Sequence, residues 1–96
     1  MILEVRGRLP QVAPNTFLAP TAQLMGDVRV GEESSVWFQT VLRGDVMPIR
    51  IGRRTNIQDG VIAHGSFGET DVVVGDEVTV GHGVILHGCH VADLCL

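Results

Sequence analysis

The four histidines of this chain, His64, His82, His87 and His90, are its most chemically versatile side chains at neutral pH. Imidazole is the commonest metal ligand in proteins and also serves as a general acid or base. The four residues are scattered along the sequence, and a lone histidine in a β-rich domain is more often structural than a ligand. Whether any of them meet therefore depends on the elements that carry them.

A hydrophobic residue recurs at every sixth position over most of the chain. The run breaks at 44–48 and resumes three residues out of phase, and a second break at 65–71 shifts the phase by five. The anchors are Val12, Leu18, Leu24, Val30, Val36, Leu42, Ile51, Ile57, Ala63, Val74, Val80, Leu86 and Ala92. Small or β-branched residues mostly follow four places later, and Gly follows directly at positions 31, 52, 75 and 81.

A period of six fits neither an amphipathic helix nor a simple hairpin, and it is typical of a hexapeptide β-helix. Three units form one triangular coil, and the coils stack as parallel sheets about 4.8 Å apart. We expect one all-β domain over 1–96, with an N-terminal segment 1–11 and about four to five coils over 12–96. The handedness of the coil does not follow from this count. The alternative is a β-rich domain with chance alternation.

The repeat brings distant polar residues into one column. Arg43, His64 and His87 each directly follow an anchor of the third unit of consecutive coils. Two imidazoles one strand spacing apart can share a metal ion at about 2.0–2.1 Å from each. The alternative is a stacked polar ladder at a subunit contact that holds no metal. The breaks 44–48 and 65–71 should emerge as loops from the same edge of the prism, where functional loops commonly lie.

His82 belongs to a different face, because it lies two places after an anchor of the second unit. Gln58 and Asp59 follow the anchor of the same face one coil earlier. Packing identical prisms around a threefold axis can bring the second face of one subunit to the third face of its neighbour. We expect His90 to be a local hydrogen-bonding or packing residue. The two cysteines, Cys89 and Cys95, are expected to be packed thiols.

The composition excludes several classes of protein. The 96 residues carry seven Arg, no Lys and eleven acidic residues, so the net charge of −4 argues against nucleic-acid or acidic-membrane partners. A hydrophobic fraction of 45% excludes a disordered chain. No apolar run is long enough for a membrane span, and two cysteines suit a reducing compartment, so we expect a cytoplasmic protein.

Five motifs occur in a fixed order along the chain. They are Arg43-Gly44-Asp45, Thr55-Asn56-Ile57-Gln58-Asp59-Gly60, His64, Val80-Gly81-His82 and Leu86-His87-Gly88-Cys89. Their order and intervals resemble those of the gamma-class carbonic anhydrases and their close relatives, over roughly residues 10–96. Hexapeptide repeats alone would be a weak signal, because many acyltransferases share them. The ordered combination is much more specific.

The resemblance implies a homotrimer of left-handed β-helices with zinc, or alternatively iron or cobalt, at each subunit interface. His64 and His87 would bind the metal from one chain and His82 from its neighbour. Three neutral imidazoles leave Zn²⁺ an open position for water, whose pKa falls to about 7. The implied reaction is the reversible hydration of carbon dioxide to bicarbonate.

The resemblance also implies roles for four polar residues. Gln58 would orient the metal-bound water or the substrate. Arg43 would form an ion network at the subunit interface with Asp45 and Asp59. Asn56 matches a family position near the site.

The loops depart from the family pattern, which places a glutamate beside the Arg-Gly-Asp segment and another after the first histidine. Val46 follows Asp45 here, and Glu69 is the only glutamate of the second loop. Glu69 is a candidate proton relay, although an exposed acidic residue is by default simply solvated. The alternatives are therefore a hexapeptide acyltransferase or a thioesterase acting on coenzyme A esters, or a non-catalytic metal-binding subunit of a larger assembly.

The end of the sequence falls inside a repeat unit. The last unit starts at Ala92 and stops at Leu96, without a polar cap. Solenoids need capped ends, and members of the resembled family continue for several coils and end in a helix. We therefore expect that C-terminal coils and a helix are missing from this chain.

Overall fold

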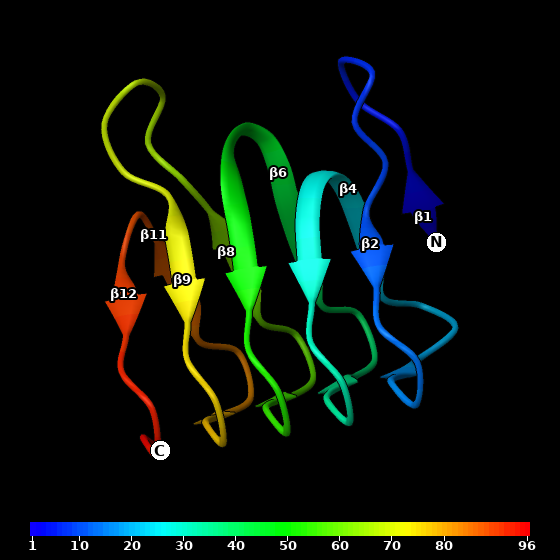
Figure 1. Cartoon of the computed structure of the whole chain (residues 1–96), viewed down its shortest axis with the longest axis vertical. Helices are drawn as coiled ribbons and strands as arrows, with labels where there is room; N and C mark the ends of the chain where they lie inside the picture. The colour runs from blue at the N-terminus through cyan, green and yellow to red at the C-terminus, as the bar shows by residue number, and fades with distance from the viewer.

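Each six-residue unit of the sequence forms a short strand and a corner, and successive units wind into a stack of coils (Figure 1). The structure is a computed structural model that describes residues 1–96. It contains no helix, and so none that is long and apolar enough to cross a membrane. The strands are β1 (Ile2–Leu3), β2 (Gln11–Val12), β3 (Phe17–Leu18), β4 (Gln23–Val30), β5 (Ser35–Val36), β6 (Val41–Ile51), β7 (Asn56–Ile57), β8 (Ile62–His64), β9 (Val72–Val74), β10 (Thr79–Val80), β11 (Ile85–His87) and β12 (His90–Val91).

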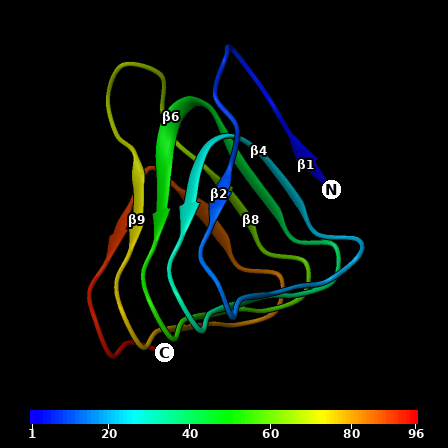
Figure 2. The same cartoon turned by 45° about the vertical axis from the view of Figure 1, so that its right-hand side comes forward.

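The strands stack in parallel into two sheets. One sheet follows the order β1-β4-β6-β8-β11, with β2, β9 and β12 joined to its other arm, and the second follows β10-β7-β5-β3. The long strands β4 and β6 bend around a corner and so serve two sides of the triangular coil, as the turned view shows (Figure 2). The prediction of an all-β, left-handed parallel β-helix is confirmed, and the chain makes about four turns.

The repeat anchors form the core. Ten of the thirteen are buried, and Val36, Leu42 and Ile57 have no exposed surface. Burying each such side chain contributes about 1.5–3 kcal/mol of transfer free energy. Val12 and Leu18 in the first coil are partly buried and pack against this cluster. The hydrophobic interior therefore follows the six-residue period from one coil to the next.

The final anchor differs from the sequence prediction. Val91 pairs with Val74 and packs against the core, whereas Ala92 is exposed. The corner that ends at β12 is one residue shorter than the six-residue spacing requires, so the phase slips by one position. Because side chains alternate between the two faces of a strand, this slip turns Ala92 outward.

Buried hydroxyl groups form hydrogen bonds between neighbouring coils. The side chains of Ser34, Thr40 and Thr55 donate to the carbonyl oxygens of Gly52, Gln58 and Gly75 at 2.7, 2.8 and 2.7 Å. All three donors are buried. Each bond satisfies a hydroxyl and a carbonyl that would otherwise be costly to bury, so it helps to hold consecutive coils in register.

The N-terminal segment joins the stack. Strand β1 pairs with β4 in parallel, and the amino group of Met1 donates to the carbonyl of Ala22. The turn that follows, with Val5 bridged to Arg8, rises beyond the coils and lies over the bend of β4 (Figure 1). This segment thus reaches the bend of β6 at residues 44–48. The loop expected there is instead a bulge within β6, where the pairing of β4 with β6 shifts register between Gly26 and Val28.

Three corner glycines lie where no side chain fits. A Cβ at Gly52 would lie 2.4 Å from the carbonyl oxygen of Gly75, and Gly31 and Gly75 are similarly crowded by the next coil. Gly81 occupies the equivalent position after its anchor but has nothing within 4 Å. The requirement for glycine therefore comes from the coil stacked above, not from the corner itself.

Replacing Gly52 by alanine should lower the free energy of unfolding by about 1–3 kcal/mol, because the new Cβ must push two backbones apart. The matched variant Gly81→Ala should change it by less than about 0.5 kcal/mol. Urea unfolding followed by circular dichroism measures both. Equal losses in the two variants would contradict the close packing of coils at this corner.

Candidate functional site

Two histidines lie side by side on the face formed by β6, β8 and β11. The strand register pairs Arg43 with His64 and His64 with His87, so the three side chains form the predicted column. The ring centroids of His64 and His87 are 5.7 Å apart, and the ring planes are tilted by 41°. Residues 23 positions apart thus present adjacent imidazoles because each follows a core anchor at the same point of its coil.

Two buried polar atoms, one on His64 and one on Asp45, lie close together at this column. His64 Nε2 and Asp45 Oδ1 are 3.3 Å apart, yet both atoms are buried and neither makes a hydrogen bond of acceptable geometry. Leaving such a polar atom unsatisfied costs about 1–3 kcal/mol. An unpartnered imidazole nitrogen next to a second imidazole is a donor set that suits a zinc, iron or cobalt ion.

Arg43 keeps the carboxylate of Asp45 ionised. Its Nη2 donates to Asp45 Oδ2 at 2.9 Å. Burial acts to raise the pKa of Asp45, but the hydrogen bond and charge of Arg43 outweigh burial and hold that pKa below its ordinary value. Asp45 therefore stays ionised beside His64. Within one chain the contact expected between Arg43 and Asp59 does not form, because Asp59 lies on another face.

A second group of polar residues surrounds a hollow on the sheet of β5, β7 and β10. His82, Gln58, Asp59, Asn56 and Trp37 line this space of about 320 Å³. His82 Nδ1 is 3.4 Å from Asp59 Oδ1. The amide of Gln58 makes no side-chain hydrogen bond, so both its N–H donors and its carbonyl acceptor remain available to a bound molecule.

Trp37 lines this hollow and Ser35 supports two of its lining residues, and neither residue is among the site residues expected from the sequence. Trp37 Nε1 donates to Ser35 Oγ at 2.8 Å, and Ser35 Oγ donates to Asn56 Oδ1 at 2.7 Å. These two hydrogen bonds in series hold the side-chain amide of Asn56 in place. The repeat contained the signal, because Trp37 and Gln58 each directly follow an anchor of the same face.

The single chain does not bring all three proposed ligands together. His64 and His87 lie on one face and His82 on another, and no group of three histidine, cysteine or acidic side chains gathers at metal-binding distance. A three-histidine site thus requires a second copy of the chain.

The 65–71 loop extends from the stack between β8 and β9 (yellow-green in Figure 1). Its tip is exposed, and Glu69 makes no side-chain hydrogen bond or ion pair. At its base Ser66 Oγ lies 3.2 Å from His87 Nε2, a contact that no repeat predicts because the loop has no repeat phase. His90 Nε2 lies 2.7 Å from Asp71 Oδ1, in keeping with the hydrogen-bonding role expected for His90.

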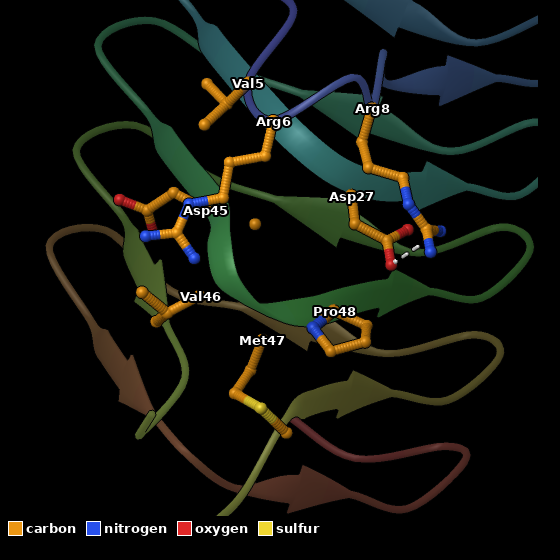
Figure 3. A pocket seen from close by; sticks show the side chains of 9 residues that line it. Val5, Arg6, Arg8, Asp27, Asp45, Val46, Met47 and Pro48 are labelled. Atoms are coloured by element: carbon orange, nitrogen blue, oxygen red, sulfur yellow. Dashed lines mark hydrogen bonds and ion pairs between the residues drawn. The ribbon is translucent and has the colours of Figure 1, made fainter. Parts of the chain in front are cut away.

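A further hollow lies beside Asp45, between the N-terminal turn and the 44–48 bulge of β6 (Figure 3). Its volume is about 310 Å³, and Arg6, Arg8, Asp27 and Asp45 supply its charges. Asp27 Oδ1 is 2.9 Å from Arg50 Nη1, and Asp27 Oδ2 is 3.4 Å from Arg8 Nη1. The hydrogen bond from Arg50 holds the pKa of Asp27 below its ordinary value. This ion network ties the N-terminal turn to the corner that carries Asp45.

Comparison with known proteins finds close relatives over almost the whole chain. This chain is 51% identical to a protein of Geobacillus kaustophilus named carbonic anhydrase. The match extends over 87 residues, which are 91% of this chain and 47% of that protein. The chain is 43% identical over 96% of its length to gamma carbonic anhydrase 3, mitochondrial, of Arabidopsis thaliana, and covers 38% of it.

The fold has close counterparts among solved structures. A hexapeptide transferase family protein from Anaplasma phagocytophilum matches with a TM-score of 0.87 and 43% identity, over 93% of this chain and 51% of that one. A search against protein-family models finds no match. The chain spans about half the length, or less, of the relatives that it matches.

The ion network around Asp27 should show in the pH dependence of stability. At pH 7, Asp27→Asn should lower the free energy of unfolding by about 0.5–1.5 kcal/mol, because the ion pairs that it removes are partly exposed to solvent. The pKa of Asp27 is lowered in the folded chain, so its contribution is present above the ordinary carboxyl pKa and is lost as the pH falls through the lowered one.

Urea unfolding of wild type and Asp27→Asn at pH 7 and pH 3 measures this difference, which should shrink at pH 3. The control is Glu32→Gln, which removes an exposed carboxylate that has no ion pair. A difference that is independent of pH would contradict the ionic origin of the contribution.

Proposed function

Because the chain belongs to the gamma carbonic anhydrase-like family of hexapeptide-repeat proteins, we propose that copies of it assemble around shared metal centres. Each centre uses His64 and His87 of one copy and His82 of the next, in a homotrimer. The observation that carries this proposal is the buried, unpartnered Nε2 of His64 beside the His87 ring. His64 and His87 lie on one face of the prism and His82 lies on another. A site with three histidines can therefore form where the first face of one copy meets the second face of the next copy.

The proposed reaction is the reversible hydration of carbon dioxide to bicarbonate. When bound, zinc, or alternatively iron or cobalt, would supply the Lewis acidity that makes a water molecule nucleophilic near neutral pH. The backbone register places the two histidines on adjacent strands, so the folded chain already holds them close together before an ion binds. Asp45, held ionised by Arg43, places a negative charge beside His64 and favours a cation at this point.

Other polar residues would act on the substrate and on the released proton. Gln58 presents an unengaged amide beside His82, where it can hydrogen-bond an oxygen of carbon dioxide or bicarbonate. Asp59 contacts His82 and can orient its ring. Asn56 is fixed by Ser35 and shapes the same hollow. Glu69, exposed on the 65–71 loop, is the candidate that passes the proton to solvent.

A transferase or thioesterase acting on coenzyme A esters is the second candidate, because a close structural counterpart is described as a member of the hexapeptide transferase family. A non-catalytic metal-binding assembly subunit is the third. Saturable binding of coenzyme A to metal-free protein would favour the second, and a metal-loaded trimer without turnover of either substrate class would favour the third. A cytoplasmic location stays a prediction.

Native mass spectrometry with metal analysis tests the shared site. Wild type should form a trimer with about one metal ion per chain. His64→Ala, His82→Ala and His87→Ala should each reduce metal content to background, because a three-ligand site loses most of its affinity with one ligand. The matched control is His90→Ala, which removes an imidazole whose hydrogen bond is to Asp71 and which is not among the proposed ligands. Full metal content in His82→Ala would contradict the shared site.

Glu69→Gln should lower kcat for carbon dioxide hydration in dilute buffer and much less in concentrated buffer, because buffer replaces a lost proton acceptor. Stopped-flow hydration at several buffer concentrations measures this dependence, with Glu32→Gln as the control. A loss of kcat that buffer does not restore would show that Glu69 has another role.

A further inference from the structure

The hydroxyl of Ser66 lies at the nitrogen that His87 would offer to a metal. Ser66 Oγ and His87 Nε2 are 3.2 Å apart, and this is the only hydrogen bond of the His87 ring. His64 Nε2, one strand away, has no hydrogen-bond partner. The two adjacent imidazoles therefore differ, because Nε2 of His87 has a hydroxyl as hydrogen-bond partner and Nε2 of His64 has none.

The base of the 65–71 loop holds the hydroxyl in this place. The backbone of Ser66 is bridged to Thr70, with the amide of Ser66 donating to the carbonyl of Thr70 at 2.9 Å and that of Thr70 donating back at 3.2 Å. Gly65 is packed so closely that a Cβ there would lie 2.6 Å from the Cβ of Met47. The position of Ser66 thus follows from backbone contacts on both sides.

The far end of the loop rests on the next coil. A Cβ at Gly88 would lie 2.3 Å from Thr70 Oγ1 and 3.3 Å from Ser66 Oγ, so the loop sits directly on this glycine. The Asp71 carboxylate is joined to His90 at 2.7 Å. His87 directly precedes Gly88, so the backbone on which the loop rests also carries the imidazole of His87. The loop contacts therefore hold Ser66 at a fixed position relative to His87.

We propose that Ser66 is a positioning residue that donates its hydroxyl hydrogen to His87 Nε2 and competes with the metal for that nitrogen's lone pair. The inference rests on the proposed metal site. A metal–imidazole bond of about 2.0–2.1 Å is shorter than the 3.2 Å contact, so hydroxyl and metal cannot occupy the same lone pair. Metal binding must turn the hydroxyl away.

The competition has a defined sign. A hydrogen bond made only in the metal-free chain stabilises that state alone and therefore weakens metal binding by the same free energy. Donation to Nε2 also keeps the neutral His87 ring protonated at Nδ1, which is the tautomer that leaves Nε2 open to a ligand. Ser66 thus keeps Nε2 of His87 unprotonated and lowers the affinity of that nitrogen for a metal ion.

Two measurements on the full chain test the proposal. Titration of Zn²⁺ or Co²⁺ against a chromophoric chelator should give about two- to tenfold tighter binding for Ser66→Ala than for wild type, the range for one neutral hydrogen bond. The matched control, Thr70→Val, keeps the shape of the loop and removes a hydroxyl that contacts no histidine; its affinity should equal that of wild type.

The second measurement needs no metal. Long-range ¹H–¹⁵N spectra of metal-free protein at a pH where His87 is neutral should show the Nδ1–H tautomer in wild type and in Thr70→Val. In Ser66→Ala the fraction of this tautomer should fall. An Nε2–H tautomer in wild type would overturn the proposal.

The outcomes separate this inference from the proposed function. If wild type binds no metal with its three histidines intact, the proposed function fails and the competition fails with it. If wild type binds metal and Ser66→Ala binds it with equal or lower affinity, only the role of Ser66 is overturned. Tighter binding with a changed tautomer supports both.

Discussion

The site depends on the parallel register of the stacked coils. Leu42, Ala63 and Leu86 pair with one another through the core, and the residues that follow them, Arg43, His64 and His87, are brought together by the same pairing. A shift of one residue in any coil would turn an anchor outward and an imidazole inward. The hydrophobic interior and the polar column are thus two consequences of one constraint, and neither can change register without the other.

The insertions are accommodated so that this register is preserved. Leu24 pairs with Leu42 eighteen residues later, but Ala63 follows Leu42 by twenty-one and Leu86 follows Ala63 by twenty-three. The additional residues leave the coil as the 44–48 and 65–71 segments, and the strands on either side stay in phase. Both segments return functional groups to the column, since the first supplies Asp45 and the second Ser66.

The regular part of the molecule could be predicted from the sequence, because a period of six relates each residue to its neighbour in the next coil. The fold, the buried anchors and the column of Arg43, His64 and His87 all follow from that period. The last anchor could not be located, because the corner before Val91 is one residue short and only tertiary pairing shows the slip. The contact of Ser66 could not be predicted because loop residues have no repeat phase, whereas the phase of Trp37 does place it beside Gln58.

The central claim is that each metal centre is divided between two copies of the chain, and mixing two defective variants tests it most directly. His64→Ala retains His82, and His82→Ala retains His64 and His87, so neither variant alone should bind metal. When they are refolded together, about one quarter of the interfaces should combine a complete set by random mixing, and metal binding should return to that extent. A mixture that binds no more metal than the separate variants, in trimers shown to be mixed, would contradict a site shared between chains.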